Sequence, residues 1–573
     1  MGLWSKLVTR FGTEARRRPN TDGRWKMAIP AVAGHLCIGS PYAWSLLADP
    51  MTRELGIVAT SAGDWGLPAT AGVMSVTFAV QGITSALVGN WQNRVGPTIC
   101  VGVAGLCFGG GMMLAGAGLL HHNLALVYAG YGVLGGISIG LAYTPPLQVL
   151  MEYFPDKKAL ASGITVAGFG SGALVFAPVA QKLMEYFRTA PQFIGAPGSC
   201  NVVPENGILF ADVSGKLIEV VMASNSTFFA DGYYAVGTGS TGIAETLMSL
   251  GAVYMGVMLA SAWGLRKAPI VDAKAPKAVV LPVRGRYPAT GDVHHDVLMK
   301  LPQFWELCAT FFCVSSGGLA LLSVAKPLML QTFASTIPSL VTPAVGSAFV
   351  MALAAGNLSG RLFWPLIAQN IGFRTTVHAM TASSAVLFMA MPTLIDAVAS
   401  TQTPAPFYAF IGSSVAIVSI MGGMYALLPA YESWKFGPKY VGSNHGRMLL
   451  GSTAAAIAGP TLLLTLREKS TQGAFRDLLA KVDPAVFEGR FGIALSDANE
   501  AISTGRITLK NLSELIPGLI DPSMFVYHST LYTMGVVMLV AMGTHYRLKP
   551  VDSKYFETPE QAAIRANPVT ARH

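Results

Sequence analysis

The chain has 573 residues, of which 52% are hydrophobic and only 12% are charged, and its formal net charge is +9. A soluble domain usually carries about 25% charged residues, so this composition excludes an ordinary soluble protein and favours an integral, multi-pass membrane protein. The positive charge does not indicate a nucleic-acid partner, because the basic residues gather in segments expected to face the cytosol.

Apolar stretches of about 20 residues, the length that crosses a bilayer as a helix, occur repeatedly along the chain. The sequence therefore predicts an all-α membrane protein embedded in the lipid bilayer. We expect twelve membrane-spanning helices, at 27–48, 67–89, 97–119, 124–151, 159–183, 245–265, 303–329, 343–367, 375–396, 406–431, 445–466 and 524–546.

Lysine and arginine in the short connecting segments indicate the orientation, because these residues are enriched on the cytosolic side. The N-terminal segment 1–26, the linker 266–302 and the tail 547–573 are rich in both. All three lie in the cytosol if the even-numbered spans end there. The long loops 184–244 and 467–523 then lie on the opposite side of the membrane.

Each long loop contains an Asn-X-Ser/Thr sequence, which makes Asn225 and Asn511 candidate glycosylation sites. We expect the plasma membrane, with an organellar membrane as the alternative, because the basic segment 1–26 also resembles a transit segment. The six cysteines show no CxxC or Cys/His spacing, so the sequence predicts no metal site and no disulfide framework. We expect no cofactor and no catalytic residues.

The chain also repeats itself weakly. Gln92-Asn93 at the end of the second span has a counterpart in Gln369-Asn370 at the end of the eighth. This repetition predicts two six-helix halves, 27–265 and 303–546, related by an axis along the membrane normal. In such an architecture the substrate binds between the halves, near the middle of the membrane.

Several motifs carry a resemblance to a known family: Tyr42-Ala-Trp-Ser45, Gly140-Leu-Ala-Tyr-Thr-Pro-Pro146, Ala161-Ser-Gly-Ile-Thr-Val-Ala-Gly-Phe-Gly-Ser-Gly172 and Gly356-Asn-Leu-Ser-Gly-Arg361. With them the chain resembles the major facilitator superfamily, in its oxalate/formate antiporter and monocarboxylate transporter branch. The resemblance covers roughly 27–183 and 245–466. It implies the major facilitator fold and rocker-switch transport of a small carboxylate.

Arg361 is the most informative single residue, because it lies inside the apolar segment 343–367. A cation roughly 10 Å from the end of a span costs at least about 2.5 kcal/mol on insertion scales. It is tolerable there if it faces water or an anion, and its forked donors match the two oxygens of a carboxylate. The resemblance implies the same role. The alternative is that the side chain snorkels to the cytosolic interface.

Three further residues are candidates for substrate binding. Asn357 lies one helical turn before Arg361, so its amide can orient the guanidinium or bind substrate, with interhelical bonding as the alternative. Tyr143 and Tyr425 occupy comparable places in the fourth and tenth spans. Each can donate a phenolic hydrogen bond to a carboxylate, or can simply pack against neighbouring helices.

His35 is a candidate proton carrier, because it lies within the first span and histidine titrates near neutral pH. The alternative is a neutral histidine bonded to a neighbouring helix. Arg94, Asn93 and Gln369 occupy the cytosolic loop motif of the superfamily. The family has an aspartate where this chain has Asn93 and Gln369, which implies a weaker charge-paired gate.

We therefore expect a transporter, not an enzyme, that carries small monocarboxylates such as lactate, pyruvate or formate and works as a monomer. Proton coupling and anion exchange both stay open as driving reactions. Oxalate transporters of the family carry a lysine in the eleventh span where this chain has Ser452. One cation suits a monoanion, so a dicarboxylate/formate exchanger is an alternative, as is a ligand sensor that does not transport.

Overall fold

The computed structural model describes residues 21–48, 50–197, 199–205, 208–213, 215–223, 229–266, 291–491, 493–503, 507–516 and 518–561. Asn225 and parts of the predicted terminal segments and linker lie outside the described residues. The chain divides into two compact units. Unit 1 comprises Met1–Leu281 with Lys439–Thr453, and unit 2 comprises Pro282–Pro438 with Ala454–His573.

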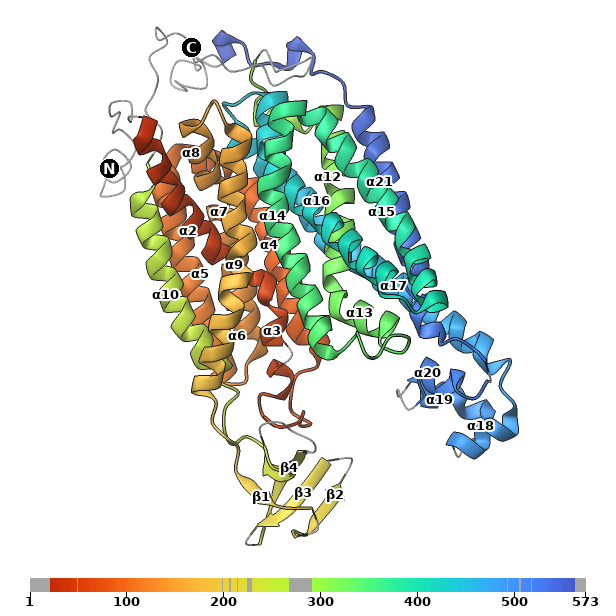
Figure 1. Cartoon of the computed structure of the whole chain (residues 1–573). Helices are drawn as coiled ribbons and strands as arrows, with labels where there is room; N and C mark the ends of the chain where they lie inside the picture. The colour runs from red at the N-terminus through yellow and green to blue at the C-terminus, as the bar shows by residue number, and fades with distance from the viewer. Residues whose placement is uncertain are drawn as a thin grey trace. The chain divides into compact units, whose positions relative to one another are not determined.

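Unit 1 is mainly helical (Figure 1). Within it α10 packs along α5, and α2 packs along α9. Its helices are η1 (Thr21–Met27), α2 (Ala28–Ile38), η2 (Ser40–Ala43), α3 (Ser45–Ala48), η3 (Pro50–Arg53), α4 (Leu67–Val95), α5 (Pro97–Leu120), α6 (Leu124–Val127), η4 (Tyr128–Leu134), α7 (Gly135–Ala142), α8 (Thr144–Tyr153), α9 (Lys158–Phe187) and α10 (Ile243–Gly264).

The first predicted span, 27–48, is interrupted rather than one continuous helix. Gly39 lies at the break, where an added Cβ would stand 2.0 Å from the carbonyl oxygen of Phe169, so glycine lets this backbone meet α9. Pro41 follows and has no N–H to continue a helix. The other eleven predicted spans correspond to the eleven helices, among the described residues, that are long and apolar enough to cross a membrane. The all-α membrane fold is confirmed.

The fourth predicted span is also interrupted at Tyr143, where α7 ends and α8 begins. Pro145 has no N–H for the carbonyl of Leu141 one turn earlier, so that carbonyl needs another donor. The buried side chain of Gln92 on α4 supplies it, with its Nε2 3.1 Å from both the Leu141 and the Gly140 oxygens. An amide from α4 therefore compensates for the backbone bond that the proline removes.

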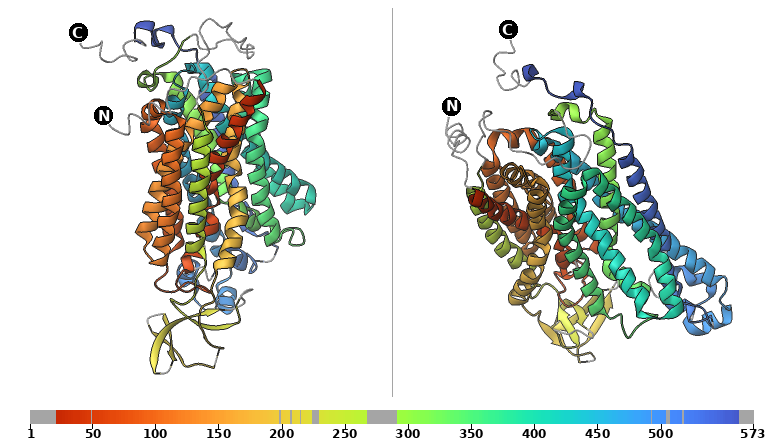
Figure 2. Two further views of the ribbon diagram at one scale, coloured as in Figure 1. Left: turned by 90° about the vertical axis from the view of Figure 1, so that its left-hand side faces the viewer. Right: turned by 45° about the horizontal axis from the view of Figure 1, so that its top comes forward.

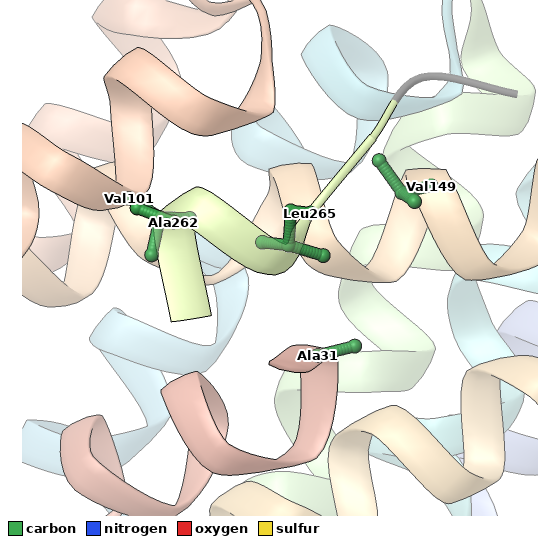
Figure 3. Packing of buried hydrophobic residues seen from close by; sticks show 5 residues of the cluster. All are labelled: Ala31, Val101, Val149, Ala262 and Leu265. Atoms are coloured by element: carbon green, nitrogen blue, oxygen red, sulfur yellow. The ribbon is translucent and has the colours of Figure 1, made fainter. Parts of the chain in front are cut away.

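Small and branched apolar side chains fill the space where α2, α5, α8 and α10 meet. Ala31, Val101, Val149, Ala262 and Leu265 are all buried there and pack together (Figure 3). Two of the five are alanines, which lets the helix backbones approach closely, as is usual in membrane helix packing.

The predicted loop 184–244 contains an antiparallel sheet that the sequence did not reveal. Its order is β1-β5-β4-β3-β2, and it lies where α9 ends and α10 begins (Figures 1 and 2). The strands are β1 (Phe193–Gly195), β2 (Val202–Glu205), β3 (Ile208–Val213), β4 (Lys216–Ala223) and β5 (Gly232–Ala235).

A carboxyl group connects the end of the first span to the start of α10. Glu54 accepts a hydrogen bond from the hydroxyl of Thr241, just before α10 begins. Burial raises the pKa of Glu54 to about 7; the carboxylates of Glu245 and Asp64 act in the same direction, and the bond from Thr241 opposes them. The folded protein therefore holds this proton more tightly than an unfolded chain does.

Because its folded pKa is raised, Glu54 stabilises the fold most at low pH, and this contribution is lost as pH rises through about 7. We expect the thermal unfolding midpoint of the purified protein to fall between about pH 5 and pH 8, and Glu54→Gln to flatten that fall. The matched control is Glu185→Gln, at an exposed position of α9. A profile that Glu54→Gln leaves unchanged would contradict this role.

Unit 2 is also helical, with α14 packed on α16, and α21 packed on α15 and α12. Helix α17 contributes its first residues, up to Thr453, to unit 1. The helices are α11 (His295–Leu298), α12 (Pro302–Ser323), α13 (Ala325–Phe333), α14 (Pro343–Ile371), α15 (Phe373–Thr401), α16 (Pro404–Phe436), α17 (Val441–Leu479), α18 (Pro484–Phe491), η5 (Leu495–Asp497), α19 (Ala498–Ser503), α20 (Leu509–Ser513), η6 (Pro522–Phe525), α21 (His528–Tyr546) and η7 (Ser553–Tyr555).

The second predicted loop, 467–523, is largely helical. Helix α17 runs on to Leu479, beyond its predicted end at 466, and α18 to α20 follow. The candidate glycosylation site Asn511 lies within α20, and its side chain is partly buried. Acceptor asparagines usually lie in surface loops, so this position is less typical than the sequence pattern alone suggested.

Candidate functional site

Helix α14 carries both Asn357 and Arg361. The helix begins after Thr342, whose hydroxyl accepts a hydrogen bond from the N–H of Val345, and it continues to Ile371. Arg361 thus lies ten residues before the helix end, or about 15 Å at 1.5 Å per residue. Arg361 therefore lies further from the helix end than the prediction of about 10 Å, because α14 continues beyond the predicted boundary at 367.

The side chain of Arg361 is completely buried, with an exposed fraction of 0%. Its Nε donates to Oδ1 of Asn357 at 3.0 Å, one turn back toward the start of α14. Long side chains on a helix usually lean in this direction. The guanidinium therefore leans away from the nearer helix end, which is opposite to the direction that snorkelling to the cytosolic interface would need.

An aromatic ring, that of Tyr425, lies near the guanidinium. The Cζ atom of Arg361 lies 5.9 Å from the ring centroid of Tyr425 on α16. The Tyr425 ring in turn meets Phe311 on α12 edge to face, at 4.9 Å between centroids. A ring at this distance attracts a cation electrostatically, so Tyr425 helps to hold the buried charge. The structure thus brings Arg361, Asn357 and Tyr425 together.

Glycines allow α14 and α16 to come close enough for these contacts. A Cβ at Gly360 would stand 2.0 Å from the carbonyl oxygen of Ser419, and one at Gly422 would stand 2.2 Å from that of Asn357. Both approaches are closer than real Cβ atoms make to backbone. Side chains larger than glycine would separate the helices and move Asn357 away from its present position.

A charge at position 357 should disturb this arrangement. Asn357→Asp would place a carboxylate next to the guanidinium, where it competes with any anion that Arg361 binds. We expect the apparent affinity for a carboxylate substrate to fall by at least about tenfold, measured as the concentration dependence of uptake. Asn370→Asp, at an exposed position of the same helix, serves as the control. An unchanged concentration dependence in Asn357→Asp would show that this amide does not act on the substrate.

Unit 1 contains the other two candidates, His35 and Tyr143, whose ring centroids are 5.4 Å apart. Both side chains are buried, and both contact Phe169 on α9. Nδ1 of His35 lies 3.1 Å from the carbonyl oxygen of Ala31 on its own helix. One ring nitrogen therefore bonds within α2, where the alternative prediction expected a partner on a neighbouring helix.

His445 is a member of this cluster that sequence reasoning did not select. It lies near the start of α17, and its ring stacks on Tyr143 at 5.8 Å between centroids. The sequence placed His445 only near the cytosolic end of the eleventh span. Nothing in the local pattern indicated that it would contact the fourth span.

The predicted gate residues lie near the ends of their helices. Arg94 is exposed in the last turn of α4, and Asn93 and Gln369 are partly buried. Gln92, noted in the sequence only as part of the repeat and not as a gate residue, makes the buried bonds to α7 described above. A polar residue beside a proline-interrupted span is the signal that could have identified it.

Two buried charged residues in the last turns of α16 were also missed. Glu432 and Lys435 have exposed fractions of 1% and 5%. Lys435 donates through Nζ to the carbonyl oxygen of Lys549 beyond the end of α21. The predicted span ends at 431, whereas α16 extends five residues further, so both residues belong to the helix.

Comparison with known proteins adds to this geometry. No family model matches the chain. The structure of a proton:xylose symporter of the major facilitator superfamily superposes with a TM-score of 0.53 at 13% identity, covering 95% of this chain and all of that one. The oxalate:formate antiporter of Oxalobacter formigenes is 25% identical over 440 residues, 76% of this chain and 83% of its own length. The chain therefore has the major facilitator fold.

A second relative is apicoplast pyruvate carrier 1 of Toxoplasma gondii. It is 26% identical over 512 residues, which cover 82% of this chain and 88% of the carrier. The chain is thus similar to transporters of the oxalate/formate antiporter and monocarboxylate transporter branch. With eleven helices long and apolar enough to cross a membrane among its described residues, the chain is an integral multi-pass membrane protein.

Proposed function

We propose that this transporter carries small monocarboxylates of the lactate, pyruvate or formate type by rocker-switch alternating access, with Arg361 binding the carboxylate. The single observation that supports this best is the complete burial of the guanidinium, which donates from Nε to Oδ1 of Asn357. A cation buried within an apolar span is costly and marks a functional site. A carboxylate would supply the opposite charge together with matching acceptor oxygens.

The substrate class is supported by the relatives and by one further position. One relative is named as a pyruvate carrier and another as an oxalate:formate antiporter. Position 452, where oxalate transporters of the branch carry a lysine, is a serine whose hydroxyl donates to the Leu449 carbonyl. A site with a single cation favours a monoanion over the dianion oxalate.

The two predicted halves, 27–265 and 303–546, would rock around the bound anion. In this scheme Tyr425 holds the guanidinium, and Tyr143 is the candidate phenol of the N-terminal half. His35, which contacts Tyr143, would carry the proton if transport is proton-coupled. Anion exchange needs no such group.

The test is transport by the purified protein in proteoliposomes, with and without a pH gradient. We expect unlabelled pyruvate, lactate or formate inside the vesicles to drive counterflow of the labelled anion, with oxalate much less effective. If an inward proton gradient accelerates uptake, transport is proton-coupled and His35 is the candidate carrier. If the gradient leaves the rate of uptake unchanged, anion exchange is favoured. Saturable binding without counterflow of any monocarboxylate would support the sensor alternative and contradict the proposal.

A further inference from the structure

Two histidines and an aspartate stand next to one another where the chain approaches α12. His294 and His295 are buried, with exposed fractions of 8% and 5%. The side chain of Asp296 is exposed. Imidazole nitrogens and carboxylate oxygens are common ligands of divalent transition metals, and here the exposed carboxylate leaves a route for an ion to enter from solvent.

The donor atoms of the three side chains converge. One ligand atom from each residue can be chosen so that all lie within 4.8 Å of one another. Nδ1 of His294 and Nε2 of His295 each lie 3.3 Å from an oxygen of Asp296. Metal–ligand bonds of about 2.0–2.2 Å in a tetrahedral site put ligand atoms roughly 3.3–3.5 Å apart. His294 meets Oδ2 and His295 meets Oδ1, so each imidazole is at ligand spacing from its own carboxylate oxygen. A carboxylate that rotates slightly, or binds through both oxygens, would complete the set around a zinc ion.

The backbone around the three residues is held in place within unit 2. The N–H of Val293 donates to the carbonyl of Phe436 at the end of α16, at 2.8 Å. The carbonyl of Asp292 accepts from the N–H of Glu557 in the C-terminal segment, also at 2.8 Å. These two bonds fix the chain directly before His294, and α11 begins at His295. A segment held in this way loses little freedom when an ion binds, which favours a preorganised site.

We propose that His294, His295 and Asp296 bind a divalent transition-metal ion of the zinc type, with a fourth position open to water. Two nitrogens and one oxygen suit zinc and its neighbours, whereas calcium and magnesium prefer oxygen ligands alone. The N–H of Asp296 now donates to Nδ1 of His294 at 3.3 Å, a contact that the ion would replace. The sequence predicted no metal site because motifs such as CxxC have other residues between their ligands. The three ligands proposed here are consecutive in the chain.

Bound ion would link three parts of unit 2 that meet at this segment. Its ligands lie at the start of α11, which precedes α12, and the adjoining backbone bonds the end of α16 and the C-terminal segment. An ion that binds only the folded protein raises its unfolding midpoint. We therefore expect metal binding to stabilise the fold.

The experiment measures metal binding by the full-length protein in detergent, after removal of any polyhistidine tag. We expect about one Zn²⁺ per chain after dialysis, a raised unfolding midpoint, and a tetrahedral absorption spectrum when Co²⁺ replaces Zn²⁺. Asp296→Asn and, separately, His295→Ala should each raise the apparent Kd for Zn²⁺ at least about tenfold.

The chain offers a matched control in its other adjacent histidine pair, His121 and His122, which precedes an asparagine instead of an aspartate. The double variant His121→Ala/His122→Ala should leave Zn²⁺ affinity unchanged. If His295→Ala fails to fold, Asp296→Asn keeps the test, because its carboxylate is exposed. Zn²⁺ binding that is not saturable, or that Asp296→Asn leaves unchanged, would overturn the proposal and leave these contacts as ordinary ion pairs.

Discussion

Replacing Arg361 with alanine is expected to abolish monocarboxylate uptake while the protein still reaches its membrane. The substitution removes the only charge that this account assigns to substrate binding. Truncating one partner of a buried, hydrogen-bonded charge pair costs about 2–5 kcal/mol, so apparent affinity should fall roughly 30-fold to several thousand-fold. The measurement is initial-rate uptake in proteoliposomes, normalised to reconstituted protein.

Two further variants make this result specific. Arg361→Lys should also impair uptake strongly, because one ammonium cannot make the forked contact that a guanidinium makes with a carboxylate. Arg490→Ala, at an exposed position of α18, should transport normally. Uptake by Arg361→Ala at the rate of the unaltered protein would refute the assigned role.

Gly422→Ala is expected to have the second largest effect, on both stability and transport. The added Cβ would stand 2.2 Å from the carbonyl oxygen of Asn357, so α16 must move away from α14. Overpacking of this kind usually costs about 1–3 kcal/mol. It also displaces Asn357 and Tyr425 from Arg361. We expect the unfolding midpoint to fall by several degrees and uptake by at least about tenfold.

The control lies on the same helix. A Cβ at Gly412 meets nothing within 4 Å, so Gly412→Ala should leave uptake intact and should not lower the unfolding midpoint. A glycine in a helix interior is less favourable than alanine by up to about 1 kcal/mol, which makes slight stabilisation the expected direction. If Gly422→Ala and Gly412→Ala behaved alike, the close approach of α14 to α16 would not support the site.

The membrane helices could be predicted because the bilayer dictates them. A lipid-exposed backbone must satisfy its own polar groups, so apolar length alone identifies α5, α15 or α21. The same argument cannot find a break such as the one at Gly39, which depends on the carbonyl of Phe169 far along the chain. Nor could it find β1 to β5, since strands of three to eight residues outside the membrane carry little periodic signal.

The candidate site was predictable to the extent that it is local. The bond from Arg361 to Asn357 follows from their spacing of four residues on one helix. The contact with Tyr425 depends on how α16 rotates against α14, and glycines of both helices set that packing. The stacking of His445 on Tyr143 joins residues distant in the sequence. No local pattern encodes such a contact.

The central claim is that the guanidinium of Arg361 recognises the negative charge of a carboxylate. It is tested most directly by comparing lactate with its neutral amide, lactamide, as competitors of labelled substrate uptake, in the unaltered protein and in Arg361→Gln. The unaltered protein should prefer lactate by at least about a hundredfold, and Arg361→Gln should bring the two competitors within a few-fold of each other. If residual uptake by Arg361→Gln kept the full preference for lactate, another group would read the charge and this account would be wrong.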